Sequence, residues 1–255
     1  MKLFEIIKSR WPEVVVVVVI QACCMFLFKD IGLINTRPEE YSGRTLLLGI
    51  GLAAFSIVGQ MMLWGFLRTT AVTGMTPIQP GMLLSIGRWY FWKLFLVQVA
   101  LSFVLILIAS VVQMFFSSIL YHKPIPENIP VWLEIIPMLI GGIVLIKPIY
   151  FIPAAILVGN LGAMEAFRYL RQLDLFRMGR FLPLAIGVTL LTGGLEFLSV
   201  WVHRTDALYY PVTILQAIII SAGLLIISLA AVVEVCNLRP KPVEDDSQDE
   251  QVSAE

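Results

Sequence analysis

The chain has 255 residues, of which 58% are apolar and only 14% are charged, and its mean hydropathy is +0.87. This composition leaves too few polar residues to cover a soluble domain, so it excludes that class and indicates an integral membrane protein. The 18 basic residues balance the 18 acidic residues, so no overall charge attracts nucleic acid.

Six apolar stretches are each long enough to cross a bilayer, because about 20 helical residues at ~1.5 Å each span a core of ~30 Å. In chain order they lie near residues 12–34, 45–67, 94–118, 133–157, 182–202 and 211–235. The sequence therefore predicts an all-α, polytopic membrane protein with a single six-helix transmembrane domain over residues 1–236. Residues 237–255 contain two prolines and six acidic residues, which predicts a disordered acidic cytoplasmic tail.

The orientation follows from the Lys and Arg residues, which are enriched in cytoplasmic loops. Six spans place both termini on one side, and twelve basic residues lie on that side against five on the other. The twelve are Lys2, Lys8, Arg10, Arg68, Arg88, Lys93, Arg168, Arg171, Arg177, Arg180, Arg239 and Lys241; the five are Lys29, Arg37, Arg44, Lys123 and Arg204. We therefore expect a multi-pass protein of a bacterial inner (plasma) membrane, with both termini cytoplasmic.

Amphipathic segments precede the first, third and fifth spans, within residues 1–11, 77–93 and 163–173. In the last of these, a helix places Met164, Ala166 and Phe167 on one side and Glu165 and Arg168 on the other. The pattern predicts cytoplasmic in-plane helices that lie along the membrane surface.

A similar tripeptide introduces each odd-numbered span: Ser9-Arg10-Trp11, Gly87-Arg88-Trp89 and Gly179-Arg180-Phe181. One interpretation is three repeated helical hairpins. The other is that arginine beside an aromatic residue suits any cytoplasmic interface, without duplication. The sequence leaves both open.

The chain lacks the residue patterns typical of catalytic, cofactor-binding or metal sites. The three cysteines and two histidines do not have the spacing of metal ligands. No phosphate-binding glycine loop or nucleophile elbow occurs. The sequence therefore predicts no enzyme, no cofactor and no metal.

Lys147 and Glu234 are candidate intramembrane polar residues, because ionisable groups in hydrocarbon are costly and often functional. Lys147 lies about ten residues from the inner end of the fourth span, and Pro148 follows it. A distortion at this proline, or a contact with Glu234 in the sixth span, would compensate the charge. Lys147 would then reach the interface or line a polar cavity.

The segment "FIPAAILVGNLGAMEAFRYLRQLDLFRMGRF", residues 151–181, resembles the membrane domain of bacterial glycerophosphodiester phosphodiesterases and related six-span envelope proteins. The matching positions are Pro153, Gly162, Glu165, Ala166, Phe167, Gly179, Arg180 and Phe181. The resemblance implies a six-span membrane domain. The soluble phosphodiesterase barrel of that family is absent from this chain, so the resemblance does not imply lipid hydrolysis.

Two functions are compatible with these features. The first is a non-enzymatic scaffold, or a component that contacts anionic headgroups or a protein partner through Arg88, Arg168, Arg171, Arg177 and Arg180. The alternative is a permease subunit of an ATP-driven transporter, in which residues 159–183 dock on the ATPase. That loop has Glu165-Ala166 and Leu182-Pro183, but its central glycine is replaced by Arg171.

Overall fold

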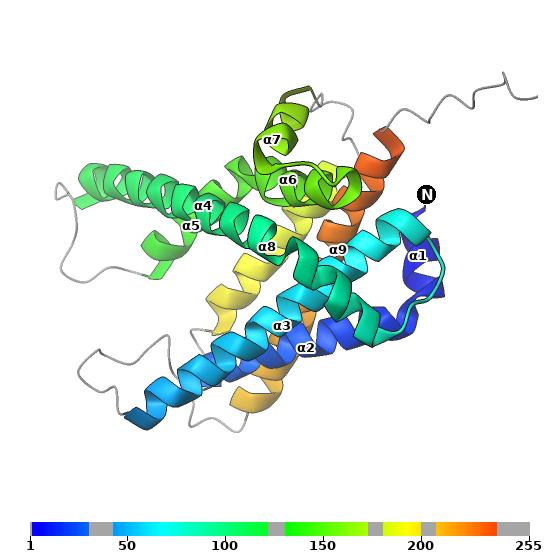
Figure 1. Cartoon of the computed structure of the whole chain (residues 1–255). Coiled ribbons are helices and arrows are strands. Elements are labelled where there is room, and N and C mark those ends of the chain that lie inside the picture. Colours follow the sequence, from blue (N-terminus) through cyan, green and yellow to red (C-terminus); the bar gives the residue numbers. More distant parts are fainter. Residues whose placement is uncertain (1, 31–42, 122–130, 173–180, 200–207, 239–255) are drawn as a thin grey trace, which may run out of the picture.

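A computed structural model describes residues 2–30, 43–121, 131–172, 181–199 and 208–238. Within these ranges the chain is helical and forms no strand (Figure 1). The helices are α1 (Leu3–Ser9), α2 (Trp11–Asp30), α3 (Gly43–Thr73), α4 (Pro80–Tyr121), α5 (Val131–Val144), α6 (Ile146–Gly159), α7 (Ala163–Gln172), α8 (Phe181–Ser199) and α9 (Tyr209–Leu238). The predicted all-α class is therefore confirmed. Nearly all of the predicted acidic tail lies outside the described residues.

Among the described residues, three helical segments are long and apolar enough to cross a membrane: Leu47–Thr73, Pro80–Ile119 and Tyr209–Leu238. The number rises to as many as five if each of two bent helix pairs is one span. These helices indicate a membrane protein, but the six predicted spans are confirmed only in part. The predicted span 133–157 is divided into α5 and α6, and the apolar part of α8, Phe181–Leu195, is shorter than a span.

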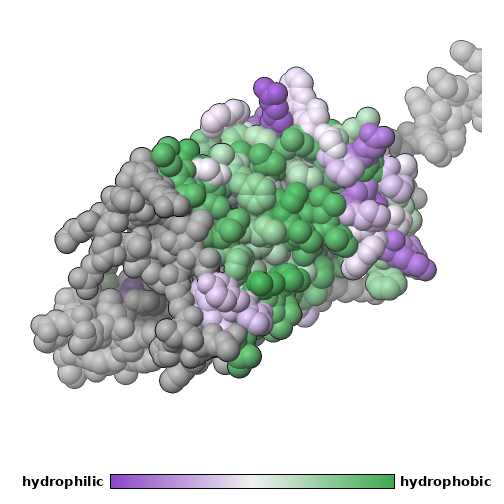
Figure 2. Space-filling model, turned by 90° about the horizontal axis from the view of Figure 1, so that it is seen from below, coloured by the Kyte–Doolittle hydropathy of each residue, from purple (hydrophilic) through white to green (hydrophobic). Residues whose placement is uncertain are grey.

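The surface of the bundle is apolar over a broad area. Figure 2 shows a wide hydrophobic surface with polar side chains gathered mainly toward one end. Along α4, large side chains such as Phe103, Leu107 and Phe115 are half or more exposed. Such a surface would be unfavourable in water and is suited to contact with lipid chains.

Helices α1 and α7 run at steep angles to the helices that adjoin them in the chain. The α1–α2 pair is bent by 89° and the α6–α7 pair by 118°. In α7, Ala166 and Leu170 are buried, whereas Met164 and Phe167 are exposed. The predicted apolar face is therefore divided, with one part packed on the protein and the other left open.

The second predicted in-plane helix does not exist as a separate element. Residues 81–93 belong to α4, a continuous helix of 42 residues that begins at Pro80. Proline is tolerated at the first helical position because its missing N–H has no partner there in any case. At ~1.5 Å per residue the helix is ~63 Å long, about twice the core of a bilayer. The correction weakens the case for three equivalent hairpins.

The three similar tripeptides also differ in their surroundings. Arg10 is fully buried, whereas Arg88 is exposed. Phe181 is buried with its ring edge-on to Phe151, at a centroid distance of 4.6 Å. Gly179 and Arg180 lie outside the described residues. The similar tripeptides therefore have different structural environments.

Helices α3 and α4 cross with their backbones in contact (Figure 1). A Cβ atom added to Gly65 would lie 1.8 Å from the carbonyl oxygen of Leu83. One added to Gly87 would lie 1.7 Å from the carbonyl oxygen of Met61. Only glycine permits this approach, as at other close crossings of membrane helices. The crossing brings the end of α3 beside the first turns of α4.

Candidate functional site: a basic pocket at one end of the bundle

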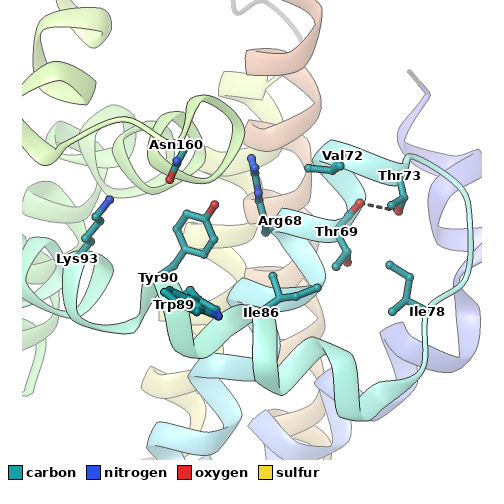
Figure 3. Close-up of a pocket in the computed structure, with 10 residues that line it drawn as sticks. All are labelled: Arg68, Thr69, Val72, Thr73, Ile78, Ile86, Trp89, Tyr90, Lys93 and Asn160. Carbon is teal, nitrogen blue, oxygen red and sulfur yellow. Dashed lines mark hydrogen bonds between the residues drawn. The ribbon is translucent and has the colours of Figure 1, made fainter.

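An open pocket of about 610 Å³ lies where the end of α3 meets the beginning of α4 and the end of α6. Figure 3 shows its ten lining side chains. They are Arg68, Thr69, Val72 and Thr73 of α3, Ile86, Trp89, Tyr90 and Lys93 of α4, and Ile78 and Asn160 from the segments that follow α3 and α6. The described residues of the lining include two cations and no carboxylate.

Arg68 joins α3 to the end of α6. Its guanidinium donates hydrogen bonds to the carbonyl oxygens of Leu157 and Val158, the second at 3.2 Å. These oxygens lie at the negative end of α6, where a cation is favoured. The guanidinium also lies 5.5 Å from the ring centroid of Tyr90. Arg68 is therefore positioned on one side by a helix end and on the other by an aromatic ring.

Asn160 ends α6 beside this arginine. Its φ of 52° and ψ of 34° lie in the left-handed region. Asparagine adopts this region more readily than most residues. Its amide lines the pocket, as Figure 3 shows.

Lys93 is the second cation of the pocket. It is exposed and makes no hydrogen bond or ion pair with the described part of the chain. In Figure 3 its side chain lies on the same side of the pocket as Tyr90 and Asn160. Trp89 is 83% exposed at the rim. An amphipathic ring beside a lysine is typical of the headgroup level of a membrane.

A buried ion pair lies behind the pocket. Arg10 is fully buried and its Nε lies 2.9 Å from Oε2 of Glu13. Its other nitrogens donate to the hydroxyl oxygens of Thr70 at 2.7 Å and Thr69 at 2.9 Å. Glu13 also accepts a hydrogen bond from the backbone N–H of Ile78. The pair therefore holds the α1–α2 corner, the end of α3 and the α3–α4 connection together.

The threonine hydroxyls also bond within α3. Thr69 and Thr70 donate to the carbonyl oxygen of Phe66 at 2.9 and 2.8 Å. Thr73 donates to the carbonyl oxygen of Thr69 at 2.7 Å. Thr69 thus accepts from Arg10 and donates to the backbone, so its role at the pocket wall is structural.

Two of the five predicted cationic residues are described in full, and both lie outside the pocket lining. Arg88 and Arg168 are exposed on α4 and α7, and neither lines the pocket. Arg171 lies in α7, and Arg177 and Arg180 lie outside the described residues. Arg68 and Lys93 were used only to orient the spans. The sequence shows that both residues lie at neighbouring ends of predicted spans, which is a signal for the pocket. It does not show that α3 and α4 cross.

Lys147 and Glu234 are both half-buried. The structure interrupts the predicted fourth span at Leu145, two residues before Lys147. Ion pairs join Lys2 to Glu5 and Arg10 to Glu13, and the contact between Lys147 and Glu234 stays a prediction. No group of three or more potential metal ligands occurs in the part of the chain that the structure describes.

No family model, curated protein or solved structure matches this chain. The resemblance of residues 151–181 to the phosphodiesterase membrane domain therefore stays a prediction. One of its positions has a clear local role, because Glu165 accepts a 2.8 Å hydrogen bond from the N–H of Gly162 at the start of α7. This contact satisfies a helix-terminal N–H, as a capping carboxylate does.

Proposed function

We propose that this chain is a non-enzymatic protein of a bacterial inner membrane, which binds the phosphate-bearing headgroup of an anionic lipid in the basic pocket. The observation that carries the proposal is that Arg68 and Lys93 line one pocket, with no carboxylate among its described lining residues. Phosphate oxygens accept charge-assisted hydrogen bonds from both groups. Because part of Arg68 already bonds to α6, Lys93 is the principal free donor.

The surroundings of the pocket suit a lipid rather than a soluble anion. Trp89 and Trp92 are largely exposed near Lys93, and Leu96 and Val99 continue as exposed apolar side chains farther along α4. Acyl chains would lie along this surface while the headgroup entered the pocket. A basic residue near an anionic surface contributes about 1 kcal/mol.

Lys93→Gln is expected to weaken the retention of phosphatidylglycerol roughly fivefold, the equivalent of about 1 kcal/mol. Native mass spectrometry of the detergent-solubilised protein, titrated with this lipid, measures the effect. The matched control is Lys8→Gln, an exposed lysine on α1 outside the pocket lining. Equal retention of the lipid by both variants and the parent protein would show that the headgroup does not bind in the pocket. Competition by inorganic phosphate alone would instead indicate a soluble anion.

The proposed orientation has a separate test. In a variant without the three native cysteines, a membrane-impermeant thiol reagent added outside intact cells should label a cysteine at Asn128. It should not label one at Ser247 until the membrane is opened. The expected contrast is near-complete against background labelling, because the two positions would be separated by the bilayer. The reverse pattern would place the termini outside.

The second proposal is the permease subunit with residues 159–183 as the docking loop. It is supported by α7, which turns away from α6 by 118° and exposes Glu165 and Arg168. An ATPase that copurifies with the parent protein but not with an Arg168→Glu variant would favour it. A lone scaffold or lipid-binding protein would yield no ATPase in either preparation.

A further inference from the structure

A cavity of about 170 Å³ with a partly polar wall lies inside the bundle, between α2, α3, α4, α6 and α9. Three glutamines, two serines and a tyrosine contribute polar groups to its wall: Gln21, Gln60, Gln98, Ser221, Ser228 and Tyr150. None of its fifteen lining residues carries a charge. The volume far exceeds the roughly 10–15 Å³ that a single water requires.

Two amide groups on this wall lack a hydrogen-bond partner. The Nε2 atom of Gln21, a donor, and the Oε1 atom of Gln60, an acceptor, are both buried and unsatisfied. A Cβ added to Gly59 would lie 3.7 Å from Nε2 of Gln21, so the Gln21 amide packs against the residue that precedes Gln60. A buried polar group without a partner is costly and rare in native proteins. The donor Nε2 of Gln21 and the acceptor Oε1 of Gln60 are therefore both free to bond a molecule that carries an acceptor and a donor.

The cavity lies near the middle of the bundle. Gln60 precedes Arg68 by eight residues and Gln21 follows Arg10 by eleven, which is ~12 and ~16 Å along a helix. Arg10 donates a hydrogen bond to Thr69, the neighbour of Arg68 in the chain, so the two arginines lie at a similar depth in the bundle. Half of a ~30 Å hydrocarbon core is ~15 Å. If that level is the edge of the core, the unsatisfied amides lie close to the bilayer midplane.

The boundary between α5 and α6 lies beside the wall. It falls at Leu145, where backbone hydrogen bonds from Leu145 to Gly141 and from Ile149 to Leu145 continue across it. Helix α6 then supplies Ile149, Tyr150, Pro153 and Ala154 to the cavity. Irregular helices are common at solute sites near the midplane of membrane proteins. The residues that follow this boundary and the unsatisfied amide atoms line the same cavity.

We propose that this cavity binds a small uncharged solute that carries both a hydrogen-bond donor and an acceptor, as a primary amide does. The acceptor of the solute would receive the N–H of Gln21, and its donor would bond to Oε1 of Gln60. An ion is disfavoured because the wall offers no opposite charge at a depth where desolvation is expensive. Apolar walls such as Trp64 and Leu225 would contact the remainder of the solute.

The test uses the full-length protein in lipid nanodiscs, with acetamide as the probe and saturation-transfer NMR as the readout. The parent protein should transfer saturation to acetamide in a saturable manner, above the signal of empty nanodiscs. Gln21→Leu/Gln60→Leu should lose most of this transfer. Gln113→Leu, a span glutamine on α4 outside the lining, should keep it. Equal transfer in the three proteins, or none in the parent, would overturn the site.

A ligand series on the parent protein decides the question even if the double variant does not fold. Acetate matches acetamide in size but is charged, and acetone keeps the acceptor without the donor. Both should give markedly weaker transfer than acetamide. If all three give the same signal, the amides do not select the ligand and the cavity holds only water.

Discussion

Gly87→Ala is expected to lower the free energy of unfolding by at least ~1–3 kcal/mol, the range for overpacked sites. The added Cβ would lie 1.7 Å from the carbonyl oxygen of Met61, and a backbone atom cannot move aside as a side chain does. Gly65→Ala should act similarly through Leu83. SDS-titration unfolding of the purified protein measures both effects.

The controls for this prediction are glycines on the same two helices. Gly51 in α3 and Gly81 in α4 have no atom within 4 Å of an added Cβ. Alanine there should be neutral or stabilising by up to ~1 kcal/mol, because it is the better helix former. If all four variants unfolded alike, α3 and α4 would not cross in contact. Since the crossing positions Arg68 beside the first turns of α4, a displaced crossing should also weaken lipid retention.

Arg10→Met is expected to destabilise the protein by about 3–5 kcal/mol, because it leaves Glu13 as a buried charge without an opposite charge beside it. It also removes the donors that bond to Thr69 and Thr70. Those bonds link the α1–α2 corner to the end of α3. The same unfolding titration measures the loss.

The double variant Arg10→Met/Glu13→Leu distinguishes the buried pair from a general packing defect. Removing both charges avoids the unpaired ion, so most of the lost stability should return. Lys2→Met removes the exposed partner of Glu5 and should leave the unfolding midpoint unchanged, because surface pairs contribute little. A double variant as unstable as the single one would mean that the pair does not control this corner.

Much of the fold could be predicted from local patterns. The described parts of the six apolar stretches all lie in helices, one of them in the α5–α6 pair. The amphipathic segment around Arg168 forms α7. Periodicity and hydropathy are properties of each helix alone, so such helices can be predicted from the sequence. Their boundaries were less predictable, because α4 continues through residues that read as an interfacial segment.

The sequence could predict some of the residues that line the pocket, but not that they meet. Arg68 and Lys93 were recognisable as basic residues at the ends of spans, together with the aromatic residues around Trp89. Their meeting depends on Gly65 and Gly87, which are compatible with many helix pairs until the partner backbone is known. The Arg10–Glu13 pair was not predicted from the sequence, and the burial of Arg10 against Thr70 depends on a residue 60 positions away.

The sequence by itself determined the helical class, the membrane character and the enrichment of basic residues at span ends, because composition and periodicity act within each segment. Tertiary structure alone decided which of these residues share a site. Helix crossings, buried ion pairs and the amides of Gln21 and Gln60 facing one cavity all depend on distances between segments far apart in the chain. Those distances are set by the packing of complementary surfaces, and single-segment patterns do not contain them.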